Sequence, residues 1–401
     1  MSDRVTVVGI GADGWDGLTG PARDAVAAAE VLMGSTRQLD LVPDATAAER
    51  VAWPSPLLPA LPGLLASYEG RRVCVLASGD PTYHGIGTTL VRLLGADRVR
   101  IVPHPSSVSL ASARLGWAQD QVVVVSLVGR PVALLHPHVQ PGRRVLVLGA
   151  ETRVREVAGL LTDRGYGDSP LTVLAQLGSD AETTVTTQAK EYDAQPDPLN
   201  VLAIECRPDD GAPLLPVVPG LPDEAFENDG QLTKREVRAV ALSRLAPIPG
   251  QLLWDVGAGA GSIAIEWSRT HPSCRAVAVE SHPDRVRRIE RNATALGVPG
   301  LQLVEGKAPE ALAGLDAPDA AFVGGGATGA GVIETCWQAL RPGGRLVVSA
   351  VTLETEAVLS RWYGELGGGL VRVGVQRASA VGGMTGWRPA MPVTIWSVVK
   401  R

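Results

Sequence analysis

Two glycine-rich loops, each directly behind a short apolar run, constrain the fold of this chain more than any other feature. The first loop, Gly9-Ile10-Gly11-Ala12-Asp13-Gly14, follows residues 5–8, and the second, Gly257-Ala258-Gly259-Ala260-Gly261, follows residues 252–256. A glycine loop that leaves a parallel strand lets the backbone approach a ligand that side chains would exclude. The sequence therefore predicts two ligand sites, and two sites favour two reactions on one polypeptide.

The length of the chain and one proline-rich stretch predict where it divides. A chain of 401 residues exceeds what a single hydrophobic core usually supports. Residues 208–223 contain five prolines and almost no periodic pattern, which is typical of a stiff connector. We expect a first domain over residues 1–207, a linker over 208–223 and a second domain over 224–401.

Apolar strand-like runs alternate with helical stretches on both sides of the proposed linker. This alternation predicts an α/β chain in which parallel sheets are wound with helices in both halves. A helix is expected over residues 21–33, with Thr19 and Pro21 as start signals. The expected strands cover residues 5–8, 73–77, 99–102, 122–127, 145–148, 171–175 and 201–205 in the first half, and 252–256, 276–280, 302–305, 320–323 and 345–350 in the second.

Charge and cysteine content exclude several classes of function. The net charge is −5, whereas a protein that grips many phosphates should be basic, so we expect no nucleic acid partner. No apolar run approaches the roughly 18 residues that cross a bilayer, and no secretory signal opens the chain. Four scattered cysteines without a CxxC pair predict neither a metal site nor disulfides, so the protein is expected in the cytoplasm.

The second glycine loop has the spacing of a particular cofactor site. Its glycines alternate at 257, 259 and 261, whereas the dinucleotide fingerprint requires its third glycine at the position of Ser262. Glu280 ends the next expected strand, where a carboxylate can accept both hydroxyls of a ribose. S-adenosylmethionine (AdoMet) has no pyrophosphate, so these features fit it better than NAD. A tight turn beside a surface glutamate remains the alternative.

The second half resembles the class I AdoMet-dependent methyltransferases. Besides the loop, Asn292 and the segments 305–308 and 341–345 carry the resemblance. Many relatives have an aspartate where Lys307 stands, so backbone near Ala308 is expected to read the adenine instead. The resemblance implies a Rossmann-like fold and the following cofactor-binding residues: Thr233, Asp255, Gly257, Ala258, Gly259, Ala260, Gly261, Glu280 and Ala308.

Two further segments of the second half concern the substrate and the start of a helix. Methyltransferases that act on base amines carry an Asn/Asp-Pro-Pro-Tyr run where this chain has Val323-Gly324-Gly325-Gly326. The glycines leave room for a broad, flat substrate instead. A capping box is predicted at Thr233-Lys234-Arg235-Glu236, with Thr233 as the cap of the following helix. Thr233 is either a helix cap alone or a cap that also lies next to the cofactor.

The first half carries a different constellation. Ser78-Gly79-Asp80-Pro81 forms an abrupt turn after an apolar run, and Ser106 and Ser107 can cap a helix through Leu115. Together with Gly9-Ile10-Gly11 these segments resemble the tetrapyrrole methylase family, a class III fold that binds AdoMet in a cleft between two α/β lobes. The resemblance implies cofactor contacts at Gly9, Gly79, Asp80, Ser106 and Ser107. Capped loops without a ligand are the alternative.

The fusion of the two halves is more diagnostic than either half. From Val5 to about Val399, including the junction at residues 226–238, the chain resembles the fused corrin methyltransferases of cobalamin biosynthesis. That resemblance implies two AdoMet sites per chain, a tetrapyrrole substrate methylated at carbons 5 and 15, and decarboxylation of the acetate on carbon 12. It assigns carbon 15 and the decarboxylation to the second domain and carbon 5 to the first, and it favours a homo-oligomer.

No residue is predicted to act as a catalytic base. The meso carbons of a reduced tetrapyrrole are already nucleophilic, so positioning can supply most of the catalysis. All but four of the 37 basic residues are arginine, which suits a polycarboxylate ligand or reflects codon bias. Arg235, Arg377 and Arg388 are the candidates for substrate carboxylates, and Trp387 either covers the macrocycle or belongs to the core.

Two other functions stay open from the sequence alone. An RNA methyltransferase with an accessory lobe is opposed by the negative net charge and by the missing Asn/Asp-Pro-Pro-Tyr run. In the other reading only the second domain is catalytic, and the first is a scaffold or an AdoMet-sensing module.

Overall fold

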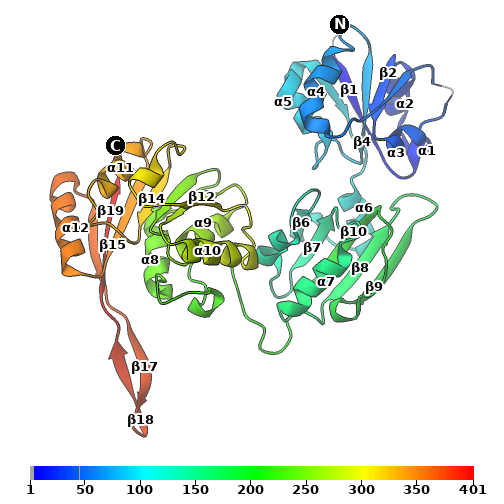
Figure 1. Cartoon of the computed structure of the whole chain (residues 1–401). Coiled ribbons are helices and arrows are strands. Elements are labelled where there is room, and N and C mark those ends of the chain that lie inside the picture. The colour runs from blue at the N-terminus through cyan, green and yellow to red at the C-terminus, as the bar shows by residue number, and fades with distance from the viewer. Residues whose placement is uncertain (1–3, 45) are drawn as a thin grey trace. The chain divides into compact units, whose positions relative to one another are not determined.

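The computed structural model describes residues 4–44 and 46–401, which form two compact units (Figure 1). Unit 1 comprises Met1–Val132 and Pro141–Ala212, and unit 2 comprises Ala133–Gln140 and Pro213–Arg401. Both units combine sheets with helices, which confirms the predicted α/β class with a methylase of two lobes followed by a Rossmann-like methyltransferase.

The first lobe of unit 1 is a parallel sheet in the order β3-β2-β4-β1-β5. Because the strands are parallel, the loops that follow β1, β4 and β5 meet at one edge of the sheet. The strands are β1 (Val5–Ile10), β2 (Val31–Gly34), β3 (Glu49–Ala52), β4 (Val73–Ser78) and β5 (Val99–Val102), and the helices are α1 (Gly14–Gly17), α2 (Gly20–Ala27), α3 (Thr36–Asp40), α4 (Leu57–Ala66) and α5 (Ile86–Leu94).

The predicted helix over residues 21–33 is wrong in its second half. Helix α2 ends at Ala27, and Val31–Gly34 forms strand β2 between β3 and β4. Val31, Leu32 and Met33 are completely buried. A strand that is covered on both faces has a continuous apolar run without alternation, which periodicity alone does not distinguish from a buried helix.

The second lobe of unit 1 is a mixed sheet in the order β6-β7-β10-β8-β9. Only β6 and β7 are parallel, so the expectation of parallel sheets throughout the first half is wrong for this lobe. Helix α6 begins as predicted, since the Ser106 hydroxyl accepts a hydrogen bond from the Ser109 N–H at 3.1 Å. The elements are α6 (Ser107–Leu115), β6 (Val122–Ser126), β7 (Arg144–Leu148), α7 (Val154–Asp163), β8 (Pro170–Ala175), β9 (Thr183–Gln188) and β10 (Asn200–Glu205).

Unit 2 contains a seven-stranded sheet in the order β13-β12-β11-β14-β15-β19-β16. The five predicted strands are parallel, and β19 runs antiparallel to both of its neighbours. Ligands bind such sheets where the strand order reverses, which here is the carboxyl end of β11 beside β14. The strands are β11 (Leu252–Val256), β12 (Arg275–Glu280), β13 (Gln302–Glu305), β14 (Ala320–Val323), β15 (Arg345–Ala350), β16 (Gly369–Val373) and β19 (Val393–Val399).

Helices cover both faces of this sheet and bury a cluster of apolar side chains on each. Alternate residues of β11 separate between the clusters: Trp254 and Val256 join one, and Leu253 joins the other. This division follows from the period-2 alternation of a strand. The helices are α8 (Arg235–Leu245), α9 (Ser262–Thr270), α10 (Pro283–Ala295), α11 (Val332–Ala339) and α12 (Leu353–Leu366).

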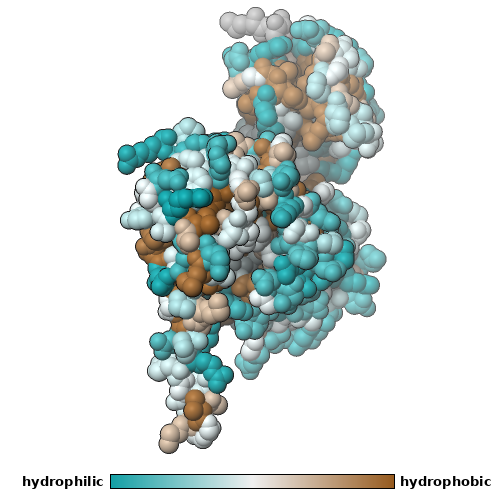
Figure 2. Space-filling view, turned by 60° about the vertical axis from the view of Figure 1, so that its left-hand side comes forward, coloured by the Kyte–Doolittle hydropathy of each residue, from teal (hydrophilic) through white to brown (hydrophobic). Residues whose placement is uncertain are grey.

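A two-stranded hairpin projects from unit 2 (Figures 1 and 2). It consists of β17 (Gln376–Val381) and β18 (Met384–Pro389), which pair antiparallel. Trp387 lies on this hairpin with 73% of its surface exposed, so the reading of Trp387 as a core residue is wrong. Figure 2 shows apolar side chains within the otherwise mostly polar surface of the hairpin.

The proline-rich segment is not a free connector along its whole length. From Pro213 onward the chain belongs to unit 2, and we call residues 213–234 the strap. Four apolar residues of the strap are buried in a cluster that also holds side chains on or beside α9 and α10. The cluster comprises Leu215, Leu221, Phe226, Leu232, Ala260, Ile265, Ala293 and Leu296.

A buried ion pair holds the strap in place. The Glu266 carboxylate accepts hydrogen bonds from the N–H groups of Gly220 at 2.6 Å and Leu221 at 3.0 Å, and from Arg238 Nε at 2.6 Å. Arg238 is fully buried and also donates to the carbonyl groups of Leu221 and Thr233. These bonds satisfy strap backbone groups that would otherwise be buried without partners.

We predict that Arg238→Met destabilises the protein by about 3–5 kcal/mol, because it leaves the Glu266 carboxylate buried without its counter-charge. Chemical denaturation of the full chain, followed by tryptophan fluorescence, measures the change. Arg361→Gln, which breaks an exposed Arg361–Glu365 pair on α12, is the control and should change the free energy of unfolding by less than about 0.5 kcal/mol. Equal effects of the two variants would contradict the assignment.

Among the residues that the structure describes, no helix is long and apolar enough to cross a membrane. The four cysteines are buried, and none forms a disulfide within the described residues.

Candidate functional site

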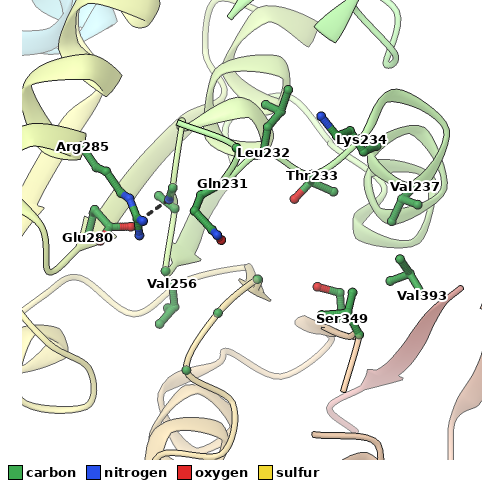
Figure 3. Close-up of a pocket in the computed structure, with 18 of the residues that line it drawn as sticks. Gln231, Leu232, Thr233, Lys234, Val237, Val256, Glu280, Arg285, Ser349 and Val393 are labelled. Carbon is green, nitrogen blue, oxygen red and sulfur yellow. Dashed lines mark hydrogen bonds between the residues drawn. The ribbon is translucent and has the colours of Figure 1, made fainter. Parts of the chain in front are cut away.

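A cavity of about 920 Å³ opens at the carboxyl ends of β11, β12 and β14 in unit 2 (Figure 3). Its volume lies near the upper end of the roughly 300–1,000 Å³ that is usual for small-molecule sites. The cavity is lined by residues 230–234, 256–259, 279–282, 306–308 and 324–326, together with Glu236, Val237, Arg285, Thr328, Gly329, Val332, Ser349, Val351, Val375, Arg377, Ala390, Met391 and Val393.

The second glycine loop forms one wall of this cavity through close backbone contacts. Gly257 has a φ of +70°, and a Cβ atom there would lie 2.8 Å from the carbonyl oxygen of Gly325. A Cβ atom on Gly259, where φ is +60°, would lie 2.8 Å from the carbonyl oxygen of Gln231 in the strap. Side chains at these two positions are therefore excluded by neighbouring backbone as well as by φ.

Glu280 is held at the cavity wall by backbone donors. One carboxylate oxygen accepts hydrogen bonds from the N–H groups of Ser281 at 2.9 Å and His282 at 3.0 Å, and the other accepts from Gly259 N–H at 2.9 Å. Figure 3 shows Glu280 and Arg285 on one side of the cavity and Thr233, Lys234 and Val237 on the other. A carboxylate has about four lone-pair sites, so these three N–H donors leave one of them for a hydroxyl group of a ligand.

Asp255, Ala260 and Gly261 do not line the cavity. Asp255 is buried beneath the loop, where its carboxylate accepts a hydrogen bond from Ala264 N–H at the start of α9, at 3.0 Å. Burial raises the pKa of Asp255 to about 7, although the bond from Ala264 opposes this shift. The position of Asp255 supports the loop and not direct contact with a ligand.

The raised pKa of Asp255 makes stability depend on pH. The folded protein binds this proton more tightly than the unfolded chain, whose aspartate pKa is about 4. The contribution of Asp255 to stability is thus complete below about pH 4 and is lost as the pH rises through 7.

We predict that Asp255→Asn removes this decline in stability with pH, because asparagine stays neutral and keeps an acceptor for Ala264 N–H. The free energy of unfolding of the variant should exceed that of the wild type at about pH 8. Identical pH profiles from denaturant titrations would contradict this prediction.

The predicted capping box at Thr233 is wrong. Helix α8 begins at Arg235 with Lys234 as its N-cap, and no side chain caps it. The first helical bond runs from Arg238 N–H to the Lys234 carbonyl, while the Thr233 carbonyl accepts from the Arg238 guanidinium. Thr233 lines the cavity, which is compatible with the second role that the sequence left open for it.

The cavity is also lined by cationic side chains that the sequence did not indicate as ligand-binding residues. Lys234, Arg285 and Lys307 join Arg377 along its walls, and only two glutamates, Glu236 and Glu280, do so. Lys234 and Glu236 belong to the same short segment as Thr233, and this closeness in the sequence could have indicated that they line the cavity. The glycines at 324–326 line the cavity, as a broad substrate would require.

The three arginines predicted for the substrate do not share one place. Arg235 lies outside the cavity lining, with its side chain close to Gly220 of the strap. Arg377 lines the cavity and donates a hydrogen bond to the Glu236 carboxylate at 2.5 Å. Arg388 lies directly opposite Arg377 in the hairpin, so these two are brought together.

The candidate site of unit 1 brings together the loops after β1, β4 and β5. A Cβ atom on Gly9 would lie 2.1 Å from the Gly79 carbonyl oxygen and 2.7 Å from the backbone nitrogen of His104. Gly79 has a φ of +58°, and a Cβ atom there would lie 3.1 Å from Ser106 Cα. The glycines at 9 and 79 thus allow the three loops to pack together.

A cavity of about 430 Å³ lies beside these loops and is lined from both lobes of unit 1. Asp80 and Ser106 line it, whereas Gly9, Gly79 and Ser107 do not. The Asp80 carboxylate accepts hydrogen bonds from Thr82 N–H at 2.8 Å and from the Thr82 hydroxyl at 2.7 Å. The other lining residues are Tyr83, Val108, Ser109, Gln119, Asp120, Val122 and Val124.

No group of three or more acidic, histidine or cysteine side chains that could hold a metal ion occurs in residues 4–44 and 46–401.

Two family models match the chain in succession. One, described as tetrapyrrole (corrin/porphyrin) methylases, matches residues 4–193, and the other, described as a precorrin methyltransferase domain, matches residues 224–400. A Saccharolobus solfataricus protein named probable cobalt-precorrin-6B C(15)-methyltransferase (decarboxylating) is 37% identical over 145 residues, covering 35% of this chain and 73% of its own. The crystal structure of the C-terminal domain of a precorrin-6Y C5,15-methyltransferase from Rhodobacter capsulatus is 41% identical, covering 46% of this chain and 100% of its own, with a TM-score of 0.44.

Curated relatives also match both halves together. The Sinorhizobium protein named precorrin-6Y C(5,15)-methyltransferase (decarboxylating) is 49% identical over 402 residues, covering 100% of this chain and 97% of its own. The chain therefore belongs to the family of the precorrin-6Y C(5,15)-methyltransferases (decarboxylating).

Proposed function

We propose that this protein uses AdoMet to methylate a reduced tetrapyrrole at carbons 5 and 15 and removes CO2 from the acetate on carbon 12, as a step of cobalamin biosynthesis. The observation that carries the proposal is the pair of cavities, one in each unit, each next to a glycine loop at the carboxyl edge of parallel strands. We further propose that each cavity binds its own AdoMet, which gives two donor sites per chain.

We assign methylation at carbon 15 and the decarboxylation to unit 2. A relative that matches 35% of the chain is named a probable C(15)-methyltransferase (decarboxylating), and the precorrin methyltransferase model matches residues 224–400, which together support the assignment. Glu280 would accept a ribose hydroxyl, and the backbone of residues 257–259 and 306–308 would face the remainder of the donor. AdoMet supplies an electrophilic methyl group when it is bound.

The residues that line the cavity of unit 2, which we call the second cavity, would act by holding the macrocycle. The glycine wall at 324–326 leaves room for its flat ring system, and the cations Lys234, Lys307 and Arg377 suit its peripheral carboxylates. Positioning of the reacting carbon can supply on the order of 7–11 kcal/mol. The apolar side chains of Val256, Val332 and Val393 offer a poorly solvated place for the acetate that loses CO2.

We assign methylation at carbon 5 to unit 1. The cleft between its two lobes would hold the donor beside Asp80 and Ser106. The buried cysteines form no disulfide within the described residues, which suits a reducing compartment and a cytoplasmic enzyme. The exposed apolar residues Val381, Met384 and Trp387 of the hairpin suit a homo-oligomer, and the net charge of −5 opposes nucleic acid as a partner.

We predict that Gly259→Trp stops the reactions of unit 2, because the indole would collide with the strap and fill the cavity. With AdoMet and a reduced precorrin, mass spectrometry should show one added methyl group and no loss of CO2, whereas the wild type adds two and loses CO2. Gly300→Trp is the matched control, since a Cβ atom at Gly300 meets nothing within 4 Å. A doubly methylated, decarboxylated product from Gly259→Trp would refute the assignment of the second site.

We predict the complementary outcome for Asp80→Ala in unit 1. This variant should accumulate a corrinoid that has lost CO2 and carries a single new methyl group, since Asp80 lines the cavity of unit 1 and not that of unit 2. Asp163→Ala, at the exposed end of α7, should give the wild-type product. Isothermal titration of AdoMet into the full chain distinguishes a scaffold from a unit 1 that binds the donor, because a scaffold would leave one donor bound per chain instead of two.

A further inference from the structure

The base of the hairpin and the start of α8 contact each other at the wall of the second cavity. Arg377, the second residue of β17, donates to Glu236, the second residue of α8, although 141 residues separate them in the sequence. Both side chains line the cavity. An arginine that binds a carboxylate in this way is already oriented for planar recognition of another carboxylate.

The ion pair is one that a ligand can displace. Its side chains are 47% and 45% exposed, and exposed pairs contribute little to stability. Glu236 lies in the first turn of α8, where the positive end of the helix stabilises its charge after Arg377 has left. Exchange of Glu236 for a carboxylate of a ligand therefore costs little.

A second arginine, Arg388, lies on the neighbouring strand of the hairpin. Arg388 stands directly opposite Arg377, and like charges in that position destabilise a two-stranded ribbon. The Arg388 side chain is exposed, and within the described part of the chain it makes no hydrogen bond or ion pair. Glu236 neutralises the Arg377 guanidinium, so the Arg388 guanidinium can still bind a carboxylate.

We propose that Arg377 exchanges Glu236 for a peripheral carboxylate of the tetrapyrrole and that Arg388 binds a neighbouring carboxylate of the same macrocycle. Glu236 then acts as a stand-in for the substrate, and the pair selects ligands that carry several carboxylates. This inference rests on the proposed function of the second unit and specifies which residues recognise its substrate.

The first arm of the test uses steady-state kinetics of the full chain with a reduced precorrin and AdoMet, with loss of CO2 as the readout. Arg377→Gln should raise the KM for the precorrin by roughly tenfold to a hundredfold, which is the range expected for a lost charge-assisted hydrogen bond. The Kd for AdoMet, measured by calorimetry, should stay unchanged. Arg388→Gln should raise the same KM, and Glu236→Gln should lower it, because it removes the competing carboxylate.

The second arm separates recognition from a structural role. The double variant Arg377→Glu with Glu236→Arg keeps an ion pair at the cavity but reverses its direction, and the precorrin KM should remain high. Recovery of the wild-type KM in this variant, or an unchanged KM in Arg377→Gln, would overturn the inference. Arg361→Gln, which breaks the exposed pair on α12, is the matched control and should leave both constants at their wild-type values. A wild-type chain that releases no CO2 from the precorrin would instead refute the proposed function, and this inference with it.

Discussion

The buried pair of Arg238 and Glu266 is the interaction on which the second cavity depends. It satisfies backbone groups of the strap at Gly220, Leu221 and Thr233, and so holds an otherwise irregular segment against α8 and α9. The end of that segment, residues 230–234, forms a wall of the cavity. A polar contact inside unit 2 therefore determines the position of groups that would face both donor and substrate.

The two units reach a similar result with different local solutions. In unit 2, a loop with alternating glycines passes over Glu280, whose carboxylate is fixed by three backbone N–H groups. In unit 1, three loops crowd around Gly9, and the cavity is completed by the second lobe. Glycine serves close packing of backbone in both cases, but a buried acid at the end of a second strand belongs to unit 2 alone in the described residues.

The features that the sequence predicted well depend on short segments. Spacing alone singled out Glu280 and the glycines at 257 and 259, which the structure brings to one cavity, since a strand, a turn, a helix and the next strand lie within 30 residues. The capping box failed because the Arg238 guanidinium occupies the Thr233 carbonyl, and β2 was missed because burial on both faces removes its alternation. The pairing of Arg377 with Glu236 joins residues 141 positions apart, so no local pattern could indicate it.

The docked strap also decides where the chain can be divided. The match to the precorrin methyltransferase domain begins at residue 224, but Leu215 and Leu221 already belong to the apolar cluster of unit 2. A fragment that starts at 224 would expose that cluster and deprive Glu266 of two of its three donors. A separately expressed second half should accordingly begin no later than Pro213, where the continuous part of unit 2 begins.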